Sequence, residues 1–312
     1  MTSISERKPE WLRVRLPTGP RVADLSTRFK QLGLHTVCDE ARCPNKGECW
    51  DAGTATVMVL GDVCTRGCRF CAVSSGHPGG TCDPHEPEHV ARALAAMDLG
   101  YVVITMVDRD DLPDGGASHV ARTIARSHAL SPKMRVEALV GDFAGRHDLI
   151  ATLVREGRPD VFAHNVEVVP RLQSAMRDAR CSWQRSTDVL RAARDAGARV
   201  IKSSLMVGCG EHDEEVLDAL GALRDAQVDV VTIGQYLRPT PKHAPVARYV
   251  EPSTFDAYRE AALAMGFAFV ASGPLVRSSY RAAEAFLSEA LKAEAPSHDR
   301  WGKRRHLEVV DA

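Results

Sequence analysis

Three cysteines within eight residues are the side chains best suited to chemistry in this sequence. Cys64, Cys68 and Cys71 are spaced C-x3-C-x2-C in the stretch Cys-Thr-Arg-Gly-Cys-Arg-Phe-Cys. A loop this short can point three thiolates at one inorganic centre. A structural zinc site takes four ligands, so a zinc loop would need Cys82 as the fourth. A [4Fe–4S] cluster usually has four cysteines as well, and with only three it would keep one iron open for a small molecule.

A second set of three cysteines lies closer to the N-terminus. Its members, spaced C-x4-C-x5-C, are Cys38, Cys43 and Cys49. Pro44, Asn45 and Gly47 are turn formers, which predicts a loop rather than a helix. One zinc ion held jointly by both sets is an alternative, but it would leave thiols unused. Nine cysteines is an odd number, and six of them fall in these two sets. This usage indicates metal binding in a reducing cytoplasm rather than a disulfide framework.

Length and composition restrict the class of protein. The chain has 312 residues, a formal charge of −1 and 44% apolar residues. One large domain with extensions, or two domains, fits this length, and the apolar fraction can supply a core. A charge near zero argues against a general binder of nucleic acid or anionic membranes. No apolar run approaches 18 residues, so we expect no membrane span. Residues 1–16 have no apolar signal-peptide core and do not form a clear transit peptide.

Strand and helix patterns alternate through the middle of the chain. β-branched apolar runs occur at 55–60, 101–107, 135–140, 160–165, 199–207, 228–233 and 267–271. Helical patterns lie between them at 87–99, 118–129, 146–155, 186–196, 211–226 and 253–265. This alternation predicts βαβ units and a parallel sheet, and six such units predict an α/β fold with a full or partial (β/α)6 TIM-type barrel. An amphipathic stretch near 21–32 precedes the barrel, and a polar tail begins near 293.

Polar or glycine-rich residues follow the expected strands, where a parallel barrel carries its working groups. Gly115 and Gly116 permit close backbone approach to a ligand or form an ordinary turn. Asn165 and Glu167 could bind a ribose or an ammonium group, or pair with each other. His243, alone in a proline-rich loop, is expected to be solvated. In Gly-Pro-Leu-Val-Arg-Ser-Ser-Tyr (273–280), Ser278 or Ser279 would cap a helix over 280–291.

The first cysteine set resembles the signature of the radical S-adenosylmethionine (SAM) superfamily. The C-x3-C-x2-C spacing matches without a gap, and Phe70 stands where that superfamily carries an aromatic residue beside the adenine. Gly208 and Glu211 match part of its G-x-I-x-G-x-x-E signature. The resemblance implies a reducing [4Fe–4S] cluster on the first set and SAM as its ligand.

From about Leu34 to Ala283, the chain resembles the lipoyl synthase family. The motifs are the second cysteine set with Cys-Pro-Asn and Glu-Cys-Trp, then Gly-Asp-x-Cys-Thr-Arg, Arg-Asp-Asp-Leu-Pro-Asp-Gly-Gly, Gly-Gln-Tyr-Leu-Arg-Pro and Arg-Ser-Ser-Tyr. The resemblance implies an auxiliary [4Fe–4S] cluster on the second set, with Ser279 as its fourth ligand. The chain departs from the family pattern at Val168, usually Thr, and at Cys209, usually Leu. Cys82, Cys181 and Cys209 are expected to be small buried or half-buried residues.

The resemblance also implies an activity and partners. A 5′-deoxyadenosyl radical would abstract hydrogen at C6 and C8 of an octanoyl chain on a carrier-domain lysine, and sulfur would come from the auxiliary cluster. Two SAM would be consumed per lipoyl group. The implied partners are octanoylated 2-oxoacid dehydrogenase E2 subunits and glycine cleavage H protein, reduced ferredoxin or flavodoxin, and an iron–sulfur carrier for cluster repair. We expect a cytoplasmic enzyme with no nucleic-acid or membrane partner.

The expected organisation has three parts. Residues 1–53 form an N-terminal extension with the auxiliary cysteines, 54–272 the barrel, and 273–312 a C-terminal extension with Arg-Ser-Ser-Tyr. Two other functions are alternatives. One is another radical sulfur-inserting or methylthio-transferring enzyme, against which the second cysteine set and Arg-Ser-Ser-Tyr argue. The other is a non-enzymatic zinc or iron–sulfur scaffold.

Overall fold

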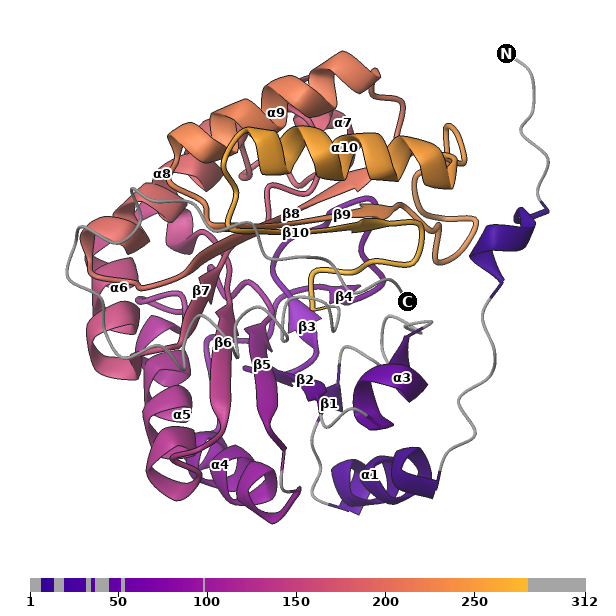
Figure 1. The fold of residues 1–312 in the computed structure, drawn as a ribbon. Coiled ribbons are helices and arrows are strands. Elements are labelled where there is room, and N and C mark those ends of the chain that lie inside the picture. Colours follow the sequence, from indigo (N-terminus) through magenta and orange to yellow (C-terminus); the bar gives the residue numbers. More distant parts are fainter. Residues whose placement is uncertain are drawn as a thin grey trace.

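The main element of the fold is an eight-stranded sheet that is curled into an open barrel (Figure 1). The structure is a computed structural model, and it describes residues 7–13, 20–31, 35–36, 45–51, 54–97 and 99–279. In sheet order the strands are β1 (His35–Thr36), β2 (Thr54–Val59), β5 (Tyr101–Met106), β6 (Arg135–Leu139), β7 (Val161–Ala163), β8 (Ile201–Val207), β9 (Val230–Gln235) and β10 (Phe269–Gly273). All neighbours pair in parallel except β1, which runs antiparallel to β2.

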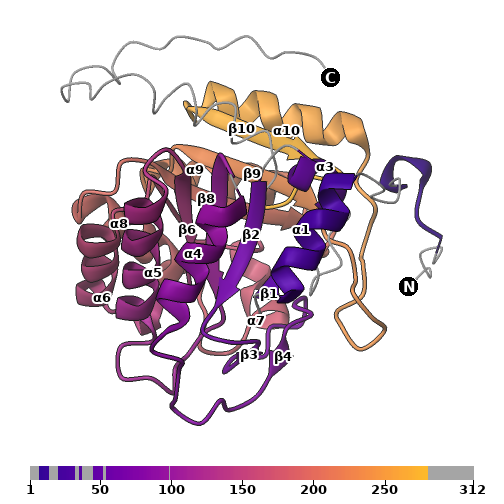
Figure 2. The same cartoon turned by 90° about the horizontal axis from the view of Figure 1, so that it is seen from below.

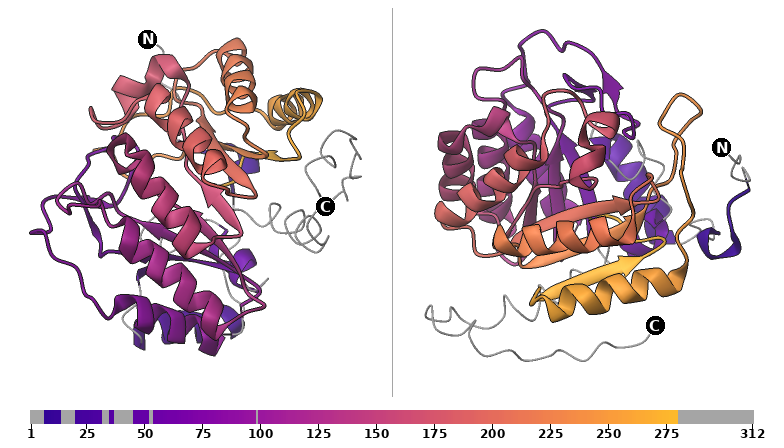
Figure 3. Two further views of the ribbon diagram at one scale, coloured as in Figure 1. Left: turned by 90° about the vertical axis from the view of Figure 1, so that its left-hand side faces the viewer. Right: turned by 90° about the horizontal axis from the view of Figure 1, so that it is seen from above.

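A helix follows each strand from β2 to β9 and covers the outer face of the sheet (Figure 3). These helices are α4 (Glu86–Met97), α5 (Ala117–Leu130), α6 (His147–Thr152), α8 (Trp183–Asp195), α9 (Asp213–Asp225) and α10 (Pro252–Ala264). Short turns add to this frame: η2 (Phe143–Gly145), η3 (Leu153–Gly157), η4 (Pro170–Leu172) and α7 (Gln173–Met176). The six strand–helix units and the final strand confirm the predicted partial (β/α)6 barrel.

Both faces of the sheet are buried, which explains why its strands are almost continuously apolar. On the inner face, a cluster that includes Val103, Val161 and Val230 is separate from the large core beneath the helices. The same face carries a buried ion pair, with Lys202 Nζ 2.7 Å from Glu137 Oε2, and Tyr101 donates a hydrogen bond of 2.6 Å to the same oxygen. The barrel interior is therefore filled with side chains.

Before the barrel come η1 (Glu10–Leu12), α1 (Pro20–Gln31) and α3 (Lys46–Asp51). Phe29 of α1 packs on Trp50 of α3 with ring centroids 5.2 Å apart, and Lys46 Nζ lies 4.2 Å from the Trp50 ring. The prediction of a loop over the whole second cysteine set was therefore wrong at its end, because Cys49 lies in a helix. Asn45 forms the turn that begins α3, and burial of Trp50 outweighs the weak helix propensity of Gly47.

Two short strands, β3 (Val63–Cys64) and β4 (Ser74–Ser75), flank the first cysteine set beyond the end of β2 (Figure 2). After β10 the chain turns back, and segment 274–279 runs past the end of β9. Cys38, Cys43 and the expected helix over 280–291 lie outside the described residues. No helix in the described ranges has both the length and the apolar character needed to cross a membrane.

Candidate active site

The first cysteine set lies at the end of the barrel where the parallel strands finish. Two of its three sulfurs accept a hydrogen bond from a backbone N–H group. Arg66 donates to Cys64 Sγ and Asp178 to Cys68 Sγ, both at 3.4 Å. At Cys71, where burial raises the pKa of the thiol, the backbone of Val73 acts to lower it. Amide donors of this kind stabilise thiolates and tune the potential of iron–sulfur clusters. The donor set therefore fits a cluster held by three thiolates.

Burial acts against ionisation of these thiols when they are alone. It raises the pKa of Cys64, and it raises the pKa of Cys71 to about 11. Hydrogen bonding to Cys181, together with burial, raises the pKa of Cys68. At neutral pH the thiols would therefore keep their protons unless a metal replaced them. No three Cys, His, Asp or Glu side chains in the described chain converge as ligands of one metal ion, so the fit rests on the donor set and its N–H partners.

Arg66, inside the motif, anchors the loop to the strand ends. Its side chain is 2% exposed and forms a two-point ion pair with Asp110, at 2.8 and 2.9 Å. It also donates to Asp142 Oδ1 at 2.7 Å and lies 3.7 Å from Asp108. Burial raises the pKa of Asp108 to about 6, although Arg66 opposes the shift. The loop is thus fixed to the segments that follow β5 and β6.

The segment after α7 holds the loop from another side. Asp178 Oδ2 accepts the Gly67 N–H at 2.9 Å, and the Arg69 N–H donates to Met176 O at 2.8 Å. Cys181 was correctly expected to be half-buried, but its position beside Cys68 and 3.4 Å from Arg66 Nη1 was not foreseen.

A third segment reaches the loop from the proline-rich turn after β9. His243 Nε2 lies 2.9 Å from the carbonyl oxygen of Cys71, and the Ala244 N–H donates to Arg69 O at 2.9 Å. The expectation of a solvated histidine was wrong, since His243 is half-buried and bonded to the cysteine loop. Sequence reasoning missed this residue because the two partners lie 172 positions apart. The nearby Gly-Gln-Tyr-Leu-Arg-Pro motif was the only signal pointing to this segment.

Asn165 and Glu167 follow β7 at the same end of the barrel. Burial raises the pKa of the Glu167 carboxyl, and both the charge of Arg177 and the neighbouring Asn165 side chain oppose that shift. Glu167 has φ 68°, a conformation that is strained for a residue with a side chain. Strain of this kind is found most often where a side chain must face a ligand. The structure therefore brings this expected pair together.

Gly208 and Glu211 form one turn after β8. The Glu211 carboxylate accepts N–H groups from Gly208 at 2.6 Å and from Cys209 at 2.9 Å. Gly208 has φ 90°, and a Cβ there would lie 2.1 Å from Gln235 Nε2 and 2.5 Å from Arg248 O. Glu211 is 4% exposed, so it fixes the shape of the turn.

Gly115 and Gly116 form the turn before α5. Both have positive φ, and a Cβ on Gly116 would lie 2.3 Å from Leu60 Cδ1. A Cβ on Gly115 would lie 3.3 Å from the Phe143 ring. Packing and turn geometry therefore explain this pair. Phe70 is half-buried beside the core, next to Cys71.

The auxiliary side of the site is described through Cys49 and Ser279. Cys49 is buried in α3, and its N–H donates to Asn45 O at 2.9 Å. The Asn45 amide donates to Leu275 O at 2.6 Å, which connects α3 to the segment that carries Ser279. That segment crosses β9 so closely that a Cβ on Gly234 would lie 2.1 Å from Val276 O. Ser279 is half-buried there.

Cys82, Cys209 and Val168 lie outside the proposed ligand sets. Cys82 is exposed, so the expectation of a buried small residue was wrong, because the loop over 76–85 lies mostly on the surface. Cys209 is half-buried, as expected, and burial raises the pKa of its thiol. Val168 is fully buried, and its carbonyl accepts the Gln173 amide at 2.6 Å.

Comparison with protein families gives two matches. The Radical SAM superfamily matches residues 58–233, which contain the first cysteine set and the barrel strands β5 to β8 in full. The N-terminal domain of lipoyl synthase of the Radical SAM family matches residues 2–43.

Known relatives extend the likeness over most of the chain. It is 60% identical to lipoyl synthase of Sorangium cellulosum over 91% of this chain and 80% of that relative. It is 52% identical to lipoyl synthase of Anaeromyxobacter sp. over 94% of this chain and 99% of that relative, and 52% identical to that of Thermus thermophilus over 91% and 88%.

Solved structures share the fold at low identity. The hydrogenase maturase HydG of Carboxydothermus hydrogenoformans superposes with a TM-score of 0.53 at 12% identity, over 86% of this chain and 78% of that one. Methylornithine synthase (PylB) gives a TM-score of 0.50 at 13% identity, over 80% and 81%. The family match and the relatives at 52–60% identity together show that the chain belongs to the lipoyl synthase family of radical SAM enzymes.

Proposed function

We propose that this enzyme inserts two sulfur atoms, at C6 and C8, into an octanoyl chain amide-linked to a carrier-domain lysine. The observation that carries the proposal is the 2.6 Å hydrogen bond from Asn45 to Leu275 O. It holds Cys49 and the segment of Ser279 at one side of the barrel end. Because β2 and β9 are parallel strands of one sheet, the loop of Cys64 lies at the same end. Substrate carbon could therefore lie near both cysteine sets.

The proposed cofactors are two [4Fe–4S] clusters and SAM. Cys64, Cys68 and Cys71 would hold the first cluster, and the second would be held by Cys38, Cys43, Cys49 and Ser279. When bound, the first supplies the electron that cleaves SAM, the second supplies sulfur, and two SAM are used per lipoyl group.

The side chains at the other strand ends would bind and orient SAM. Glu167 is a half-buried carboxylate with a raised pKa, so it would gain from pairing with the ammonium group of SAM. Asn165 beside it would bind the ribose, and Phe70 would pack on the adenine. Gly208 and Glu211 would shape the nucleoside site, and Gly115 and Gly116 would set the facing turn. The barrel wall would keep water from the radical.

The proposed partners follow from this chemistry. The substrate would be an octanoylated 2-oxoacid dehydrogenase E2 domain or glycine cleavage H protein. Reduced ferredoxin or flavodoxin would supply electrons, and an iron–sulfur carrier would restore the auxiliary cluster. The reducing cytoplasm suits all of these components.

An anaerobic assay tests the proposal. The reconstituted chain should be brown and bind about eight irons, as two four-iron clusters require. With SAM and dithionite it should convert an octanoyl-lysine peptide to the lipoyl product, identified by mass spectrometry. A colourless zinc protein, or an octanoyl peptide left unchanged by fully loaded enzyme, would contradict the proposal. If reconstitution loads no more than about four irons per chain, the proposed auxiliary cluster would be ruled out.

A further inference from the structure

The outer rim of the cysteine loop carries exposed cations. We infer that Arg69, Arg238 and Lys242, here called the basic rim, form a docking surface for an acidic protein that delivers single electrons to the Cys64–Cys71 loop. The inference rests on the proposed function, because it names the partner that would reduce the first cluster.

Hydrogen bonds join the segment of Arg69 to the segment of Arg238 and Lys242, and they join the latter segment to Cys71, a proposed cluster ligand. The Ala244 N–H donates to Arg69 O at 2.9 Å. The side chain of His243, next to Lys242, lies 2.9 Å from Cys71 O. Arg238 Nε donates to His243 O at 2.9 Å. The rim is therefore connected to Cys71 through one imidazole ring, which gives an electron a short route from the surface.

The charges of the basic rim are not neutralised within the described residues. All three side chains are exposed, and no carboxylate described here lies within ion-pair distance of them. Arg69 donates instead to Ala175 O at 3.1 Å, and Arg238 donates to the carbonyls of His243 and Pro241. Carbonyl partners orient a guanidinium group without cancelling its charge.

Other exposed arginines at this end of the barrel are paired with carboxylates. Arg180 pairs with Asp178 at 2.8 Å, and Arg171 pairs with Glu215 at 2.7 Å. The guanidinium groups of Arg69 and Arg238 both lie close enough to Tyr236 to oppose the burial that raises its pKa to about 12. The rim is thus a local concentration of positive charge, which attracts an acidic partner and speeds its association.

The position of the rim favours an electron donor over the acyl carrier. In the proposed function the acyl chain lies between the two cysteine sets, and Asn45 and Leu275 are on the auxiliary side. The rim instead adjoins the backbone of Cys71, where the first cluster would be reduced. In the proposed step the donor loses one electron and the cluster gains one for each SAM cleaved.

Charge reversal on the holoenzyme tests the inference. The double variant Arg69→Glu/Lys242→Glu would be assayed for 5′-deoxyadenosine with reduced acidic [2Fe–2S] ferredoxin and, separately, with dithionite. We expect the KM for ferredoxin to rise about ten-fold, since steering by charge changes association rates by this order. Added salt should raise the wild-type KM in the same direction, because it screens the attraction. The rate with dithionite, which needs no docking surface, should stay at the wild-type value.

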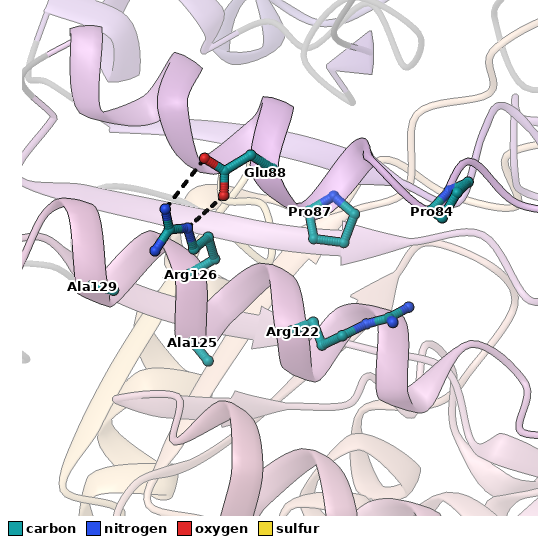
Figure 4. A pocket seen from close by; sticks show the side chains of 7 residues that line it. All are labelled: Pro84, Pro87, Glu88, Arg122, Ala125, Arg126 and Ala129. Atoms are coloured by element: carbon teal, nitrogen blue, oxygen red, sulfur yellow. Dashed lines mark hydrogen bonds and ion pairs between the residues drawn. The ribbon is translucent and has the colours of Figure 1, made fainter.

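The matched control is Arg122→Glu. Arg122 is also exposed, and it lies in a groove between α4 and α5 that is lined by Pro84, Pro87, Glu88, Arg122, Ala125, Arg126 and Ala129 (Figure 4). This groove is on the outer helix layer. Arg122→Glu makes the same change in net charge as one rim substitution, and it should leave the KM for ferredoxin unchanged.

Several outcomes would overturn the inference. One is an unchanged KM for ferredoxin in the double variant, and another is an equal rise in Arg122→Glu. A raised KM for an octanoylated carrier domain, with that for ferredoxin unchanged, would assign the rim to the substrate carrier. If the double variant also loses activity with dithionite, Lys242→Glu alone decides by the same criteria. Failure of the proposed function is distinguishable, because wild-type enzyme would then form no lipoyl product even with dithionite, whereas the KM for ferredoxin is still read from 5′-deoxyadenosine.

Discussion

The two cysteine regions are attached to the barrel in different ways. The Cys64–Cys71 loop is held from three sides: by Arg66 at the ends of β5 and β6, by Asp178 after α7, and by His243 after β9. In the auxiliary region, as far as the structure describes it, a side-chain hydrogen bond from Asn45 connects α3 to the segment of Ser279.

This difference matches the proposed use of the two clusters. A cluster that is reduced and reoxidised in every cycle works best in a rigid site, because small movements change both electron transfer and the position of SAM. A cluster that gives up its sulfur has to be replaced, so its site has to open. The comparison predicts separate effects for substitutions in the two regions.

The largest effect is expected at the rigid loop. Cys68→Ala removes one of three ligands and should abolish SAM cleavage, and with it all lipoyl product. Anaerobic measurement of 5′-deoxyadenosine checks this. Persistent formation in the variant would show that the reducing cluster had been assigned to the wrong cysteine set.

The second-largest effect should separate SAM cleavage from sulfur insertion. Ser279→Ala or Cys43→Ala should leave 5′-deoxyadenosine formation intact and remove carbon–sulfur bond formation, because the auxiliary cluster would donate sulfur without binding SAM. If Ser279 were only a helix cap, its loss would cost about 1 kcal/mol of stability and leave insertion largely intact. Measuring thermal midpoint and product in the same variant decides between the two roles, and a normal product yield would exclude the ligand role.

The third effect concerns stability. Arg66→Met should lower the free energy of unfolding by about 3–5 kcal/mol, because it removes the 2.7 Å partner of the buried Asp142 carboxylate and leaves only Arg185, at 3.8 Å. Arg180→Met is the matched control, since Arg180 is 48% exposed and pairs with Asp110 and Asp178. Exposed pairs of this kind contribute about 0–1 kcal/mol. Urea unfolding of both variants provides the measurement, and equal losses would mean that Arg66 is not the main anchor of the loop.

Local patterns in the sequence were sufficient to predict the barrel. Runs of β-branched residues located β2 and β5 to β10, and cysteine spacing identified the first ligand set, because both signals lie within short stretches of chain. The anchors of the loop could not be found this way. His243 meets Cys71, and Asn45 meets Leu275, only after folding brings together positions 172 and 230 residues apart. Helix α3 was missed because burial of Trp50, rather than local propensity, decides its structure.

The smallest effect is expected at Asn45, and it tests how far the hydrogen bond between α3 and the segment of Ser279 holds the auxiliary region. Asn45→Ser introduces no charge at this buried position, and both residues are favoured where a helix begins. The substitution removes the amide donor to Leu275 O, a bond worth about 1 kcal/mol net. We therefore expect a chelator to remove the auxiliary iron about five-fold faster, since 1 kcal/mol corresponds to roughly that factor.

The reducing cluster provides the internal control for this experiment. Iron bound at Cys64, Cys68 and Cys71 should be lost at the wild-type rate in Asn45→Ser, because its anchors do not involve Asn45. SAM cleavage should then persist while the yield of lipoyl product falls with the auxiliary iron. If the auxiliary and the reducing cluster both lost iron faster in the variant, the two regions would open as one unit. If neither rate changed, contacts other than the one from Asn45 to Leu275 would hold the auxiliary site.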